Sequence, residues 1–278
     1  MVLPNFLGIG AQRCGTTLLN AILETHPEIY VPTRRKEIHF FDRHFDRGLD
    51  WYRSFFPDGE AAKAYRAIGE VTPDYIYFAE AAERIIETMP RDCRFIVTLR
   101  HPARRVFSGY THHRRAFNEK RPFERFVDEQ EDATARGFYS RQLQRFFDAY
   151  PREQFLILIF EEWLKEPAPA LDQIRSFLGL THGWANPETV LAEKTERTTV
   201  PYFPTAFYWA RSFGQMLTRR DLDWLVNIVK ATKVHRLFGV ERAPAGMPPA
   251  MRERLDALYA DEVRSVERLL GREIHAWR

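Results

Sequence analysis

Short apolar runs that alternate with helical patterns are the feature of this sequence that most constrains its fold. Three runs have the length and composition of buried strands: Asn5–Ala11, Arg94–Leu99 and Phe155–Phe160. Helical spacing of apolar residues is found at Thr16–Glu24, from Pro102 toward Arg115, at Ala168–Leu178 and at Met251–Leu270. Strands that alternate with helices predict an α/β protein with three layers, in which a central, mostly parallel sheet is flanked by helices on both faces.

No internal repeat and no Gly/Ser-rich linker divides the chain. Its 278 residues therefore predict a single domain over residues 1–278. Two stretches, Thr181–Thr205 and Val240–Pro249, are richer in Pro, Thr and polar residues, and we expect them to be loops of this domain, the first acting as a lid.

Composition excludes several classes of protein. No apolar run approaches the roughly 18 residues of a membrane-spanning helix, and the mean hydropathy is −0.43. A net charge of +3 predicts a mildly basic surface, which suits one small polyanion in a cleft better than a nucleic acid. Cys14 and Cys93 are too few for a disulfide framework, so we expect a reducing, cytoplasmic location.

The loop after the first strand has the parts of an anion site. It reads Gly-Ala-Gln-Arg-Cys-Gly-Thr-Thr from Gly10 and leads directly into a helix. Free backbone amides at a helix N-terminus bind anions, and Gly15 permits a close backbone approach. Thr16 and Thr17 can cap the helix or donate to an oxyanion. The alternative is an ordinary strand-to-helix turn capped by threonine.

This loop lacks the features of a Walker A motif. That motif has Lys directly after its second glycine, whereas here Thr16 follows Gly15 and the cation is Arg13. The second strand is followed by Arg100 rather than by an acid that would bind magnesium. The sequence therefore predicts an anion held without a divalent metal, and it favours transfer of a sulfuryl group, which carries less charge than a phosphoryl group.

A second anion site is indicated where Arg100 precedes the helix that begins at Pro102. Ser108 lies one helical turn beyond Arg104, so Arg100 and Ser108 can hold a second phosphate. The alternative is a helix start with a solvated basic face.

The segment from Lys36 to Asp42 carries a candidate acid–base pair. In an extended conformation Glu37 and His39 point to one face and Ile38 to the other. A carboxylate beside an imidazole next to an anion site can take a proton from a nucleophile. A surface contact, or a metal site that includes His39 and His44, would place the same residues together.

Two longer motifs resemble the sulfotransferases that use 3'-phosphoadenylyl sulfate (PAPS). QRCGTTLL is similar to their 5'-phosphosulfate loop, with Arg13 at the usual Lys position, and TLRHPARRVFSGY is similar to their 3'-phosphate motif. KEIHFFDRHFDRGLDWYRSFFP, EVTPDY from Glu70 and the region ending SFLGL further resemble the heparan sulfate glucosaminyl 3-O-sulfotransferases and their N-sulfotransferase relatives. The resemblance implies a P-loop-like fold and sulfuryl transfer from PAPS, which is released as adenosine 3',5'-bisphosphate (PAP), with no metal required.

The resemblance also implies roles for individual residues. Glu37 would be the catalytic base, with His39 and Arg13 assisting the transfer. His39 and Asp42 would also lie on the acceptor side. Apart from the resemblance, the basic Arg43 is expected to line a groove for an acidic saccharide, and Glu70 is expected to contact the substrate. The donor would be held by Arg13, Cys14, Gly15, Thr16, Thr17, Leu18, Arg100 and Ser108, together with Arg197 and Thr198 in the loop after residue 180.

This chain departs from the pattern at two places. Val71 stands where those enzymes carry a catalytic and acceptor-side Lys, and no cysteine follows SFLGL, where they carry a disulfide.

We expect the acceptor to be an oligo- or polysaccharide that receives the sulfuryl group on a hydroxyl or an amine. A lipid, a small metabolite or a carrier-bound polyketide are the alternatives. Two rival functions are a magnesium-dependent nucleotide kinase and a non-catalytic polyanion-binding module.

Overall fold

A five-stranded parallel sheet forms the centre of the computed structural model, which describes residues 2–185, 199–201, 239–241 and 246–278. The strand order is β2-β3-β1-β4-β5, and every neighbouring pair runs parallel. The strands are β1 (Phe6–Gly10), β2 (Ile29–Tyr30), β3 (Ala67–Val71), β4 (Arg94–Leu99) and β5 (Phe155–Ile159). The predicted parallel sheet is thus confirmed, and β4 has the predicted bounds.

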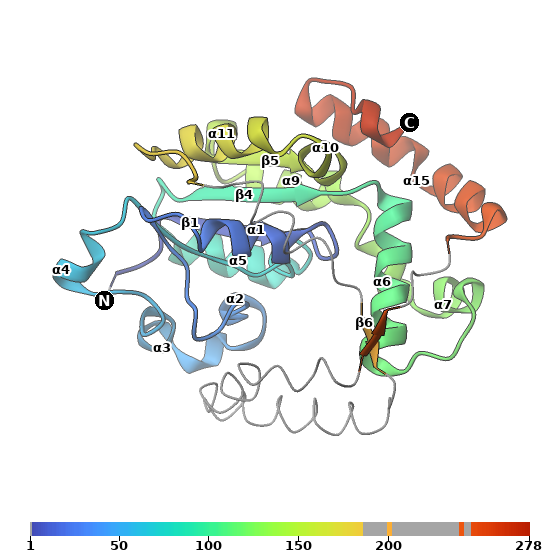
Figure 1. Cartoon of the computed structure of the whole chain (residues 1–278), viewed down its shortest axis with the longest axis horizontal. Helices are drawn as coiled ribbons and strands as arrows, with labels where there is room; N and C mark the ends of the chain where they lie inside the picture. The colour runs from blue at the N-terminus through green and yellow to red at the C-terminus, as the bar shows by residue number, and fades with distance from the viewer. Residues whose placement is uncertain (1, 186–198, 202–238, 242–245) are drawn as a thin grey trace.

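Helices cover both faces of this sheet (Figure 1). The helices are α1 (Thr16–Leu23), α2 (Phe40–Arg43), α3 (Leu49–Arg53), α4 (Gly59–Ala62), α5 (Ala79–Thr88), α6 (Pro102–Phe117), α7 (Phe123–Glu129), α8 (Glu131–Ala135), α9 (Tyr139–Phe147), α10 (Phe160–Lys165), α11 (Pro167–Leu178) and α15 (Pro249–Leu270).

Two apolar clusters show how the layers pack. Alternate strand residues such as Leu7 and Phe95 pack with α5 and α9 in one cluster. Their neighbours Phe6 and Ile96 pack with α1 and α11 in the other. Because successive strand residues point to opposite faces, the two clusters lie on opposite sides of the sheet. The three-layer prediction is therefore confirmed.

A third cluster joins helices beyond the sheet. Residues of α6, α7 and α15, including Val106, Phe126 and Leu255, form this cluster. Pro102 opens α6, as its fixed φ and missing N–H favour at the first helical position. Among the described residues, no helix combines the length and apolar character needed to cross a bilayer.

Several elements differ from the sequence expectation. Phe160 begins α10 instead of ending the third predicted strand. The strand β3 escapes a search for apolar runs because a glutamate, Glu70, lies near its end. The two expected loops contain a short antiparallel pair, β6 (Thr199–Pro201) and β7 (Gly239–Glu241), and strands of three residues are too short for their periodicity to be detected. The remainder of the expected lid, from residue 186 to 198 and beyond 201, lies outside the described residues.

Candidate active site

The candidate site lies where β1 and β4 end and α1 and α6 begin. In open parallel sheets this edge is where ligands bind. Gly15 turns the chain into α1 with a φ of 91°. A Cβ on Gly15 would lie 2.4 Å from the Phe160 ring, so close packing also requires glycine here. The loop is thereby held against α10, the helix that follows β5.

The N-terminus of α1 keeps its amides available. Gly15 is the N-cap residue, and no side chain caps the helix. The N–H groups of Thr16, Thr17 and Leu18 precede the first intrahelical donors and are directed out of the helix end. Thr16 is buried, whereas the exposed Thr17 accepts a hydrogen bond from Lys36 Nζ at 3.0 Å. The suggestion that these threonines cap the helix is therefore wrong, because neither provides a capping hydrogen bond.

Arg13 and Ser108 meet across 95 residues of sequence. The Nε of Arg13 donates to Ser108 Oγ at 3.4 Å. Burial and the charges of Arg115 and Arg100 lower the pKa of Arg13 to about 10. Within the part of the chain that the structure describes, Arg13 has no carboxylate partner. Guanidinium groups that repel one another in a partly buried loop form a site for an oxyanion.

Arg100 is held by the segment that follows β5. Its guanidinium lies 5.1 Å from the centroid of the Phe160 ring, and its Nε lies 4.0 Å from Glu161 Oε1. The same Glu161 oxygen accepts the backbone N–H of His101 at 3.2 Å. The structure thus places Arg100 among the charges that act on Arg13, at the same edge of the sheet as Ser108.

The segment around Glu37 and His39 is bent rather than extended. His39 is in the left-handed region, with φ 56° and ψ 35°, and α2 begins immediately after it. The extended conformation considered from the sequence is therefore not found at His39. The two side chains nevertheless meet, with Glu37 Oε2 3.5 Å from His39 Nε2, and Ile38 between them is fully buried.

Both residues of this pair are charged near neutral pH. Burial raises the pKa of Glu37, but hydrogen bonds and charges from His39 and Lys36 outweigh it and lower that pKa to about 2. Burial lowers the pKa of His39, but hydrogen bonds with Asp42 and Glu37 outweigh it and raise that pKa to about 9. Lys36 Nζ also bonds Glu37 Oε1 at 2.6 Å while it reaches Thr17, so the candidate base is tethered to the start of α1.

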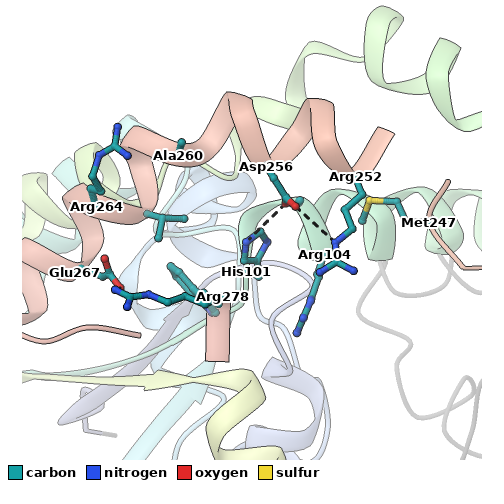
Figure 2. Close-up of a pocket in the computed structure, with 12 residues that line it drawn as sticks. His101, Arg104, Met247, Arg252, Asp256, Ala260, Arg264, Glu267 and Arg278 are labelled. Carbon is teal, nitrogen blue, oxygen red and sulfur yellow. Dashed lines mark ion pairs between the residues drawn. The ribbon is translucent and has the colours of Figure 1, made fainter. Parts of the chain in front are cut away.

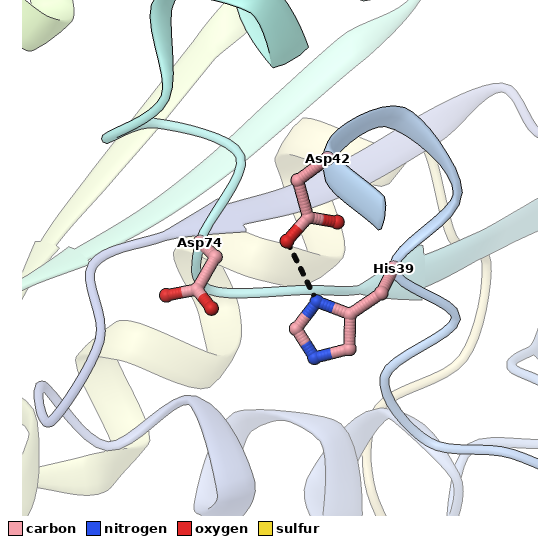
Figure 3. Close-up of side chains that lie close together, drawn as sticks. All are labelled: His39, Asp42 and Asp74. Carbon is pink, nitrogen blue, oxygen red and sulfur yellow. Dashed lines mark hydrogen bonds and ion pairs between the residues drawn. The ribbon is translucent and has the colours of Figure 1, made fainter. Parts of the chain in front are cut away.

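His39, Asp42 and Asp74 converge closely enough to suggest a metal site (Figure 3). His39 Nδ1 lies 2.8 Å from Asp42 Oδ2. Arg43 and Arg136 each donate to Asp74 at 2.8 Å, and Arg43 Nε lies 3.4 Å from Asp42. Two guanidinium groups already supply the positive charge, so the cluster is an ion-pair network and its donor set does not fit a metal ion. His44, the second histidine of the metal alternative, is not part of this cluster.

Glu70 does not reach the acceptor side. It has no exposed surface, and its carboxylate accepts hydrogen bonds from the hydroxyls of Thr72, Tyr75 and Tyr52. Burial raises the pKa of Glu70 to about 7, although the Thr72 and Tyr75 hydroxyls oppose this. The expectation that Glu70 contacts substrate is therefore wrong, because the strand that carries it is covered on both faces.

Val71 is also part of the core. It has no exposed surface and packs against Gly8, where its Cγ2 lies 2.8 Å from the position a Cβ would take. Val71 therefore supplies packing where a lysine would supply a charge. Arg43, by contrast, keeps 55% of its side chain exposed beside Asp42.

Arg197 and Thr198 lie outside the described residues. Four described residues that matter to the site were absent from the predicted set: Lys36, Asp74, Arg136 and Glu161. Glu161 follows β5 at the carboxyl edge of the sheet, which is a signal that could have identified it. Lys36 adjoins Glu37, but Asp74 and Arg136 are 62 residues apart and carry no local signal.

A cavity of about 390 Å³ lies between the start of α6 and α15 (Figure 2). Its lining carries four arginines and two carboxylates, and one of these carboxylates, Asp256, lies 3.8 Å from His101 and 3.6 Å from Arg252. None of Arg13, Glu37 and Ser108 lines it. The cavity is therefore separate from the candidate site.

A parallel sheet flanked by helices, with a loop of the anion-binding kind between its first strand and first helix, is the arrangement of the P-loop-like class of proteins. The sulfotransferase domain family model matches residues 3–199. The chain therefore belongs to the sulfotransferase domain family, as its motifs predicted.

Known relatives refine this placement. Human heparan sulfate glucosamine 3-O-sulfotransferase 3B1 is 33% identical over 194 residues, which are 64% of this chain and 46% of that protein. Bovine bifunctional heparan sulfate N-deacetylase/N-sulfotransferase 2 is 31% identical over 200 residues, covering 64% of this chain and 22% of that protein. The chain thus spans less than half the length of these relatives. A sulfotransferase from Alicyclobacillus acidocaldarius has a similar structure, with a TM-score of 0.70, 25% identity and 100% coverage of both chains.

Proposed function

We propose that this chain transfers a sulfuryl group from PAPS to a hydroxyl or amine of a saccharide. The observation that carries the proposal is the tether from Glu37 through Lys36 to Thr17. It sets an ionised carboxylate beside the amides of α1, at the edge of the sheet where Arg13 and Ser108 meet. A proton acceptor next to an oxyanion site is what a group-transfer reaction of this kind requires.

The donor would be held at its two anionic ends. The amides of residues 14–18 and Arg13 suit the phosphosulfate, whereas Arg100 and Ser108 suit the 3'-phosphate. The acceptor oxygen or nitrogen forms a bond to sulfur as the bond from sulfur to the phosphate oxygen breaks. Glu37 accepts the nucleophile's proton, and Arg13 and the amides stabilise the charge that develops on the departing PAP.

The proposal includes no divalent metal. Arg100, a cation, occupies the position after β4 where a magnesium-binding acid would stand, and the acidic pair of Asp42 and Asp74 near Glu37 is neutralised by arginines. A nucleotide kinase is therefore the weaker alternative.

A saccharide acceptor is supported by the names of the relatives and by the exposed Arg43. Because Val71 is buried at the position where the resemblance implies a lysine in those enzymes, we expect acceptor contacts that differ from theirs. Heparan sulfate itself is accordingly one candidate among acidic and neutral saccharides.

Isothermal calorimetry tests the donor assignment. PAP and PAPS are titrated into the protein with and without magnesium, with ADP and AMP as comparison ligands. We expect PAP and PAPS to bind at least about tenfold more tightly than the nucleotides lacking a 3'-phosphate, independently of magnesium. Magnesium-dependent binding of ATP would support a kinase instead, and binding of polysaccharide without any affinity for PAP would support a non-catalytic module.

A further inference from the structure

Glu70 is a buried carboxylate that forms no ion pair among the described residues, although the charge of His39 lies near enough to act on it. It lies near the end of β3 with no exposed surface. Its two oxygens instead accept three hydroxyls: Tyr75 at 2.7 Å and Tyr52 at 3.3 Å on Oε1, and Thr72 at 2.6 Å on Oε2. A buried charge satisfied only by hydroxyls is costly to maintain, so its retention calls for a role.

Two of these hydroxyls connect Glu70 to the start of α2. The backbone N–H of Phe40 donates to Tyr75 Oη at 2.9 Å, and the backbone N–H of His39 is 3.4 Å from Thr72 Oγ1. No side chain of α2's own N-cap residue, His39, caps the helix. The hydroxyls of Thr72 and Tyr75 therefore take the place of a helix cap.

The carboxylate determines which way these hydroxyls point. Above its pKa of about 7, Glu70 is ionised and only accepts hydrogen bonds, so both hydroxyls then turn their protons toward it. Their lone pairs are then left to accept the N–H groups of His39 and Phe40. The arrangement holds His39 in its left-handed conformation, which would otherwise cost about 1 kcal/mol or more.

We propose that Glu70 is a positioning residue, which acts through the Thr72 and Tyr75 hydroxyls to hold His39 against Glu37 and Asp42. The part of this proposal that concerns catalysis rests on the proposed function. The part that concerns the position of His39 does not, because it can be measured without donor or acceptor.

The chain offers a closely matched control. Tyr52 also donates to Glu70 Oε1 in the same core, and it stacks on Phe40 with ring centroids 4.5 Å apart. Its hydroxyl, however, accepts no backbone N–H of α2 among the described residues. Tyr52→Phe removes one hydrogen bond to the carboxylate without breaking the connection to α2.

The first measurement is an NMR titration of the His39 imidazole in protein without nucleotide. We expect Tyr75→Phe and Glu70→Gln to move the His39 pKa from about 9 down toward its ordinary 6.5, because the ring leaves Asp42 and Glu37. Tyr75→Phe decides the point, because it keeps the Glu70 carboxylate, whose charge also acts on His39 directly. Tyr52→Phe leaves the His39 pKa unchanged. An unchanged His39 titration in Tyr75→Phe would overturn the proposal, whatever the enzyme's activity.

The second measurement separates positioning from folding. We expect kcat at saturating donor and acceptor to fall about 10- to 100-fold in Glu70→Gln and Tyr75→Phe, while PAP affinity stays within about twofold of the wild type. Thr72→Ser, which keeps the hydroxyl, retains activity, and Thr72→Val does not. Equal losses in Tyr52→Phe, or wild-type kcat in Thr72→Val, would show a purely structural role. If the wild type binds no PAP, the proposed function fails, while the His39 titration still decides the positioning role.

Discussion

Glu37 and His39 keep their charges in a partly buried site because each supplies the other's counter-charge. Desolvation alone would neutralise both side chains. With Glu37 at a pKa of about 2 and His39 at about 9, both stay charged across the neutral range. Glu37 is then ready to accept a proton, and the imidazolium beside it is ready to stabilise a developing negative charge.

Replacement of the base tests this arrangement. Glu37→Gln keeps the shape of the side chain but cannot accept the nucleophile's proton, so we expect kcat to fall by about 100-fold or more. Steady-state sulfuryl transfer from PAPS measures the change, and calorimetry should show PAP affinity within about twofold of the wild type. The exposed Glu60 provides the control variant, Glu60→Gln, with normal turnover. Near-normal turnover in Glu37→Gln would remove Glu37 from the role of base.

Arg100 and Arg104 provide a second test at the residue scale. Both guanidinium groups lie within 4.0 Å of the same oxygen of Glu161, but only Arg100 stacks on Phe160 beside the loop. We expect Arg100→Ala to weaken PAP binding by about 10- to 100-fold while AMP binding changes little, because a charged hydrogen bond contributes about 1.5–3 kcal/mol. Arg104→Ala should leave both affinities unchanged. Equal effects of the two substitutions on PAP binding would contradict the assignment of the 3'-phosphate to Arg100.

Among the elements, the turn from β1 into α1 is the one in which conformation and packing both demand glycine. Gly15 combines a φ of 91° with an approach of 2.4 Å between its Cβ position and the Phe160 ring. The contact ties the loop to α10, the helix whose Glu161 also approaches Arg100. One residue of this turn therefore influences both proposed anion sites.

Gly15→Ala should reduce the free energy of unfolding by about 2–4 kcal/mol, because left-handed strain and a steric clash add together. Gly271→Ala is the matched control: Gly271 is also left-handed, with φ 66° and ψ 19°, but a Cβ there meets nothing within 4 Å, so only the strain of about 1 kcal/mol remains. Urea unfolding measures the free energy of unfolding of both variants. A loss at Gly15 no larger than that at Gly271 would show that the contact with Phe160 is relaxed at no cost.

Across the whole molecule, buried ionisable groups make stability depend on pH. Burial raises the pKa of Glu70 from 4.5 to about 7 in the folded state. The folded protein then holds a proton that the unfolded chain has released. The contribution of Glu70 to stability is therefore complete below pH 4.5 and is lost as the pH rises through 7.

Comparison of the wild type with Glu70→Gln isolates this contribution. Between pH 4.5 and 6.5 we expect the free energy of unfolding of the wild type to fall by about 2–3 kcal/mol relative to the variant, because each pKa unit corresponds to about 1.4 kcal/mol. Urea unfolding at both pH values measures the difference. This window lies below the range in which His39, with its raised pKa, loses its proton. If the free energy of unfolding changed with pH in the same way for the wild type and for Glu70→Gln, Glu70 would titrate normally. The control is Glu80→Gln, at an exposed site, whose free energy of unfolding should follow that of the wild type at both pH values.

The amino-acid sequence by itself determined the α/β class, the bounds of β4 and the place of the anion loop. These features depend on local patterns: the length of an apolar run, the spacing of leucines along a helix, and glycines at a turn. The left-handed conformation of His39, the burial of Glu70 and the contact of Arg13 with Ser108 were decided only by tertiary structure. The physical reason is that a side chain's direction follows from its backbone dihedral angles and its packing partners. Thr72, the partner of His39, is 33 residues away in the sequence, and Ser108, the partner of Arg13, is 95 residues away.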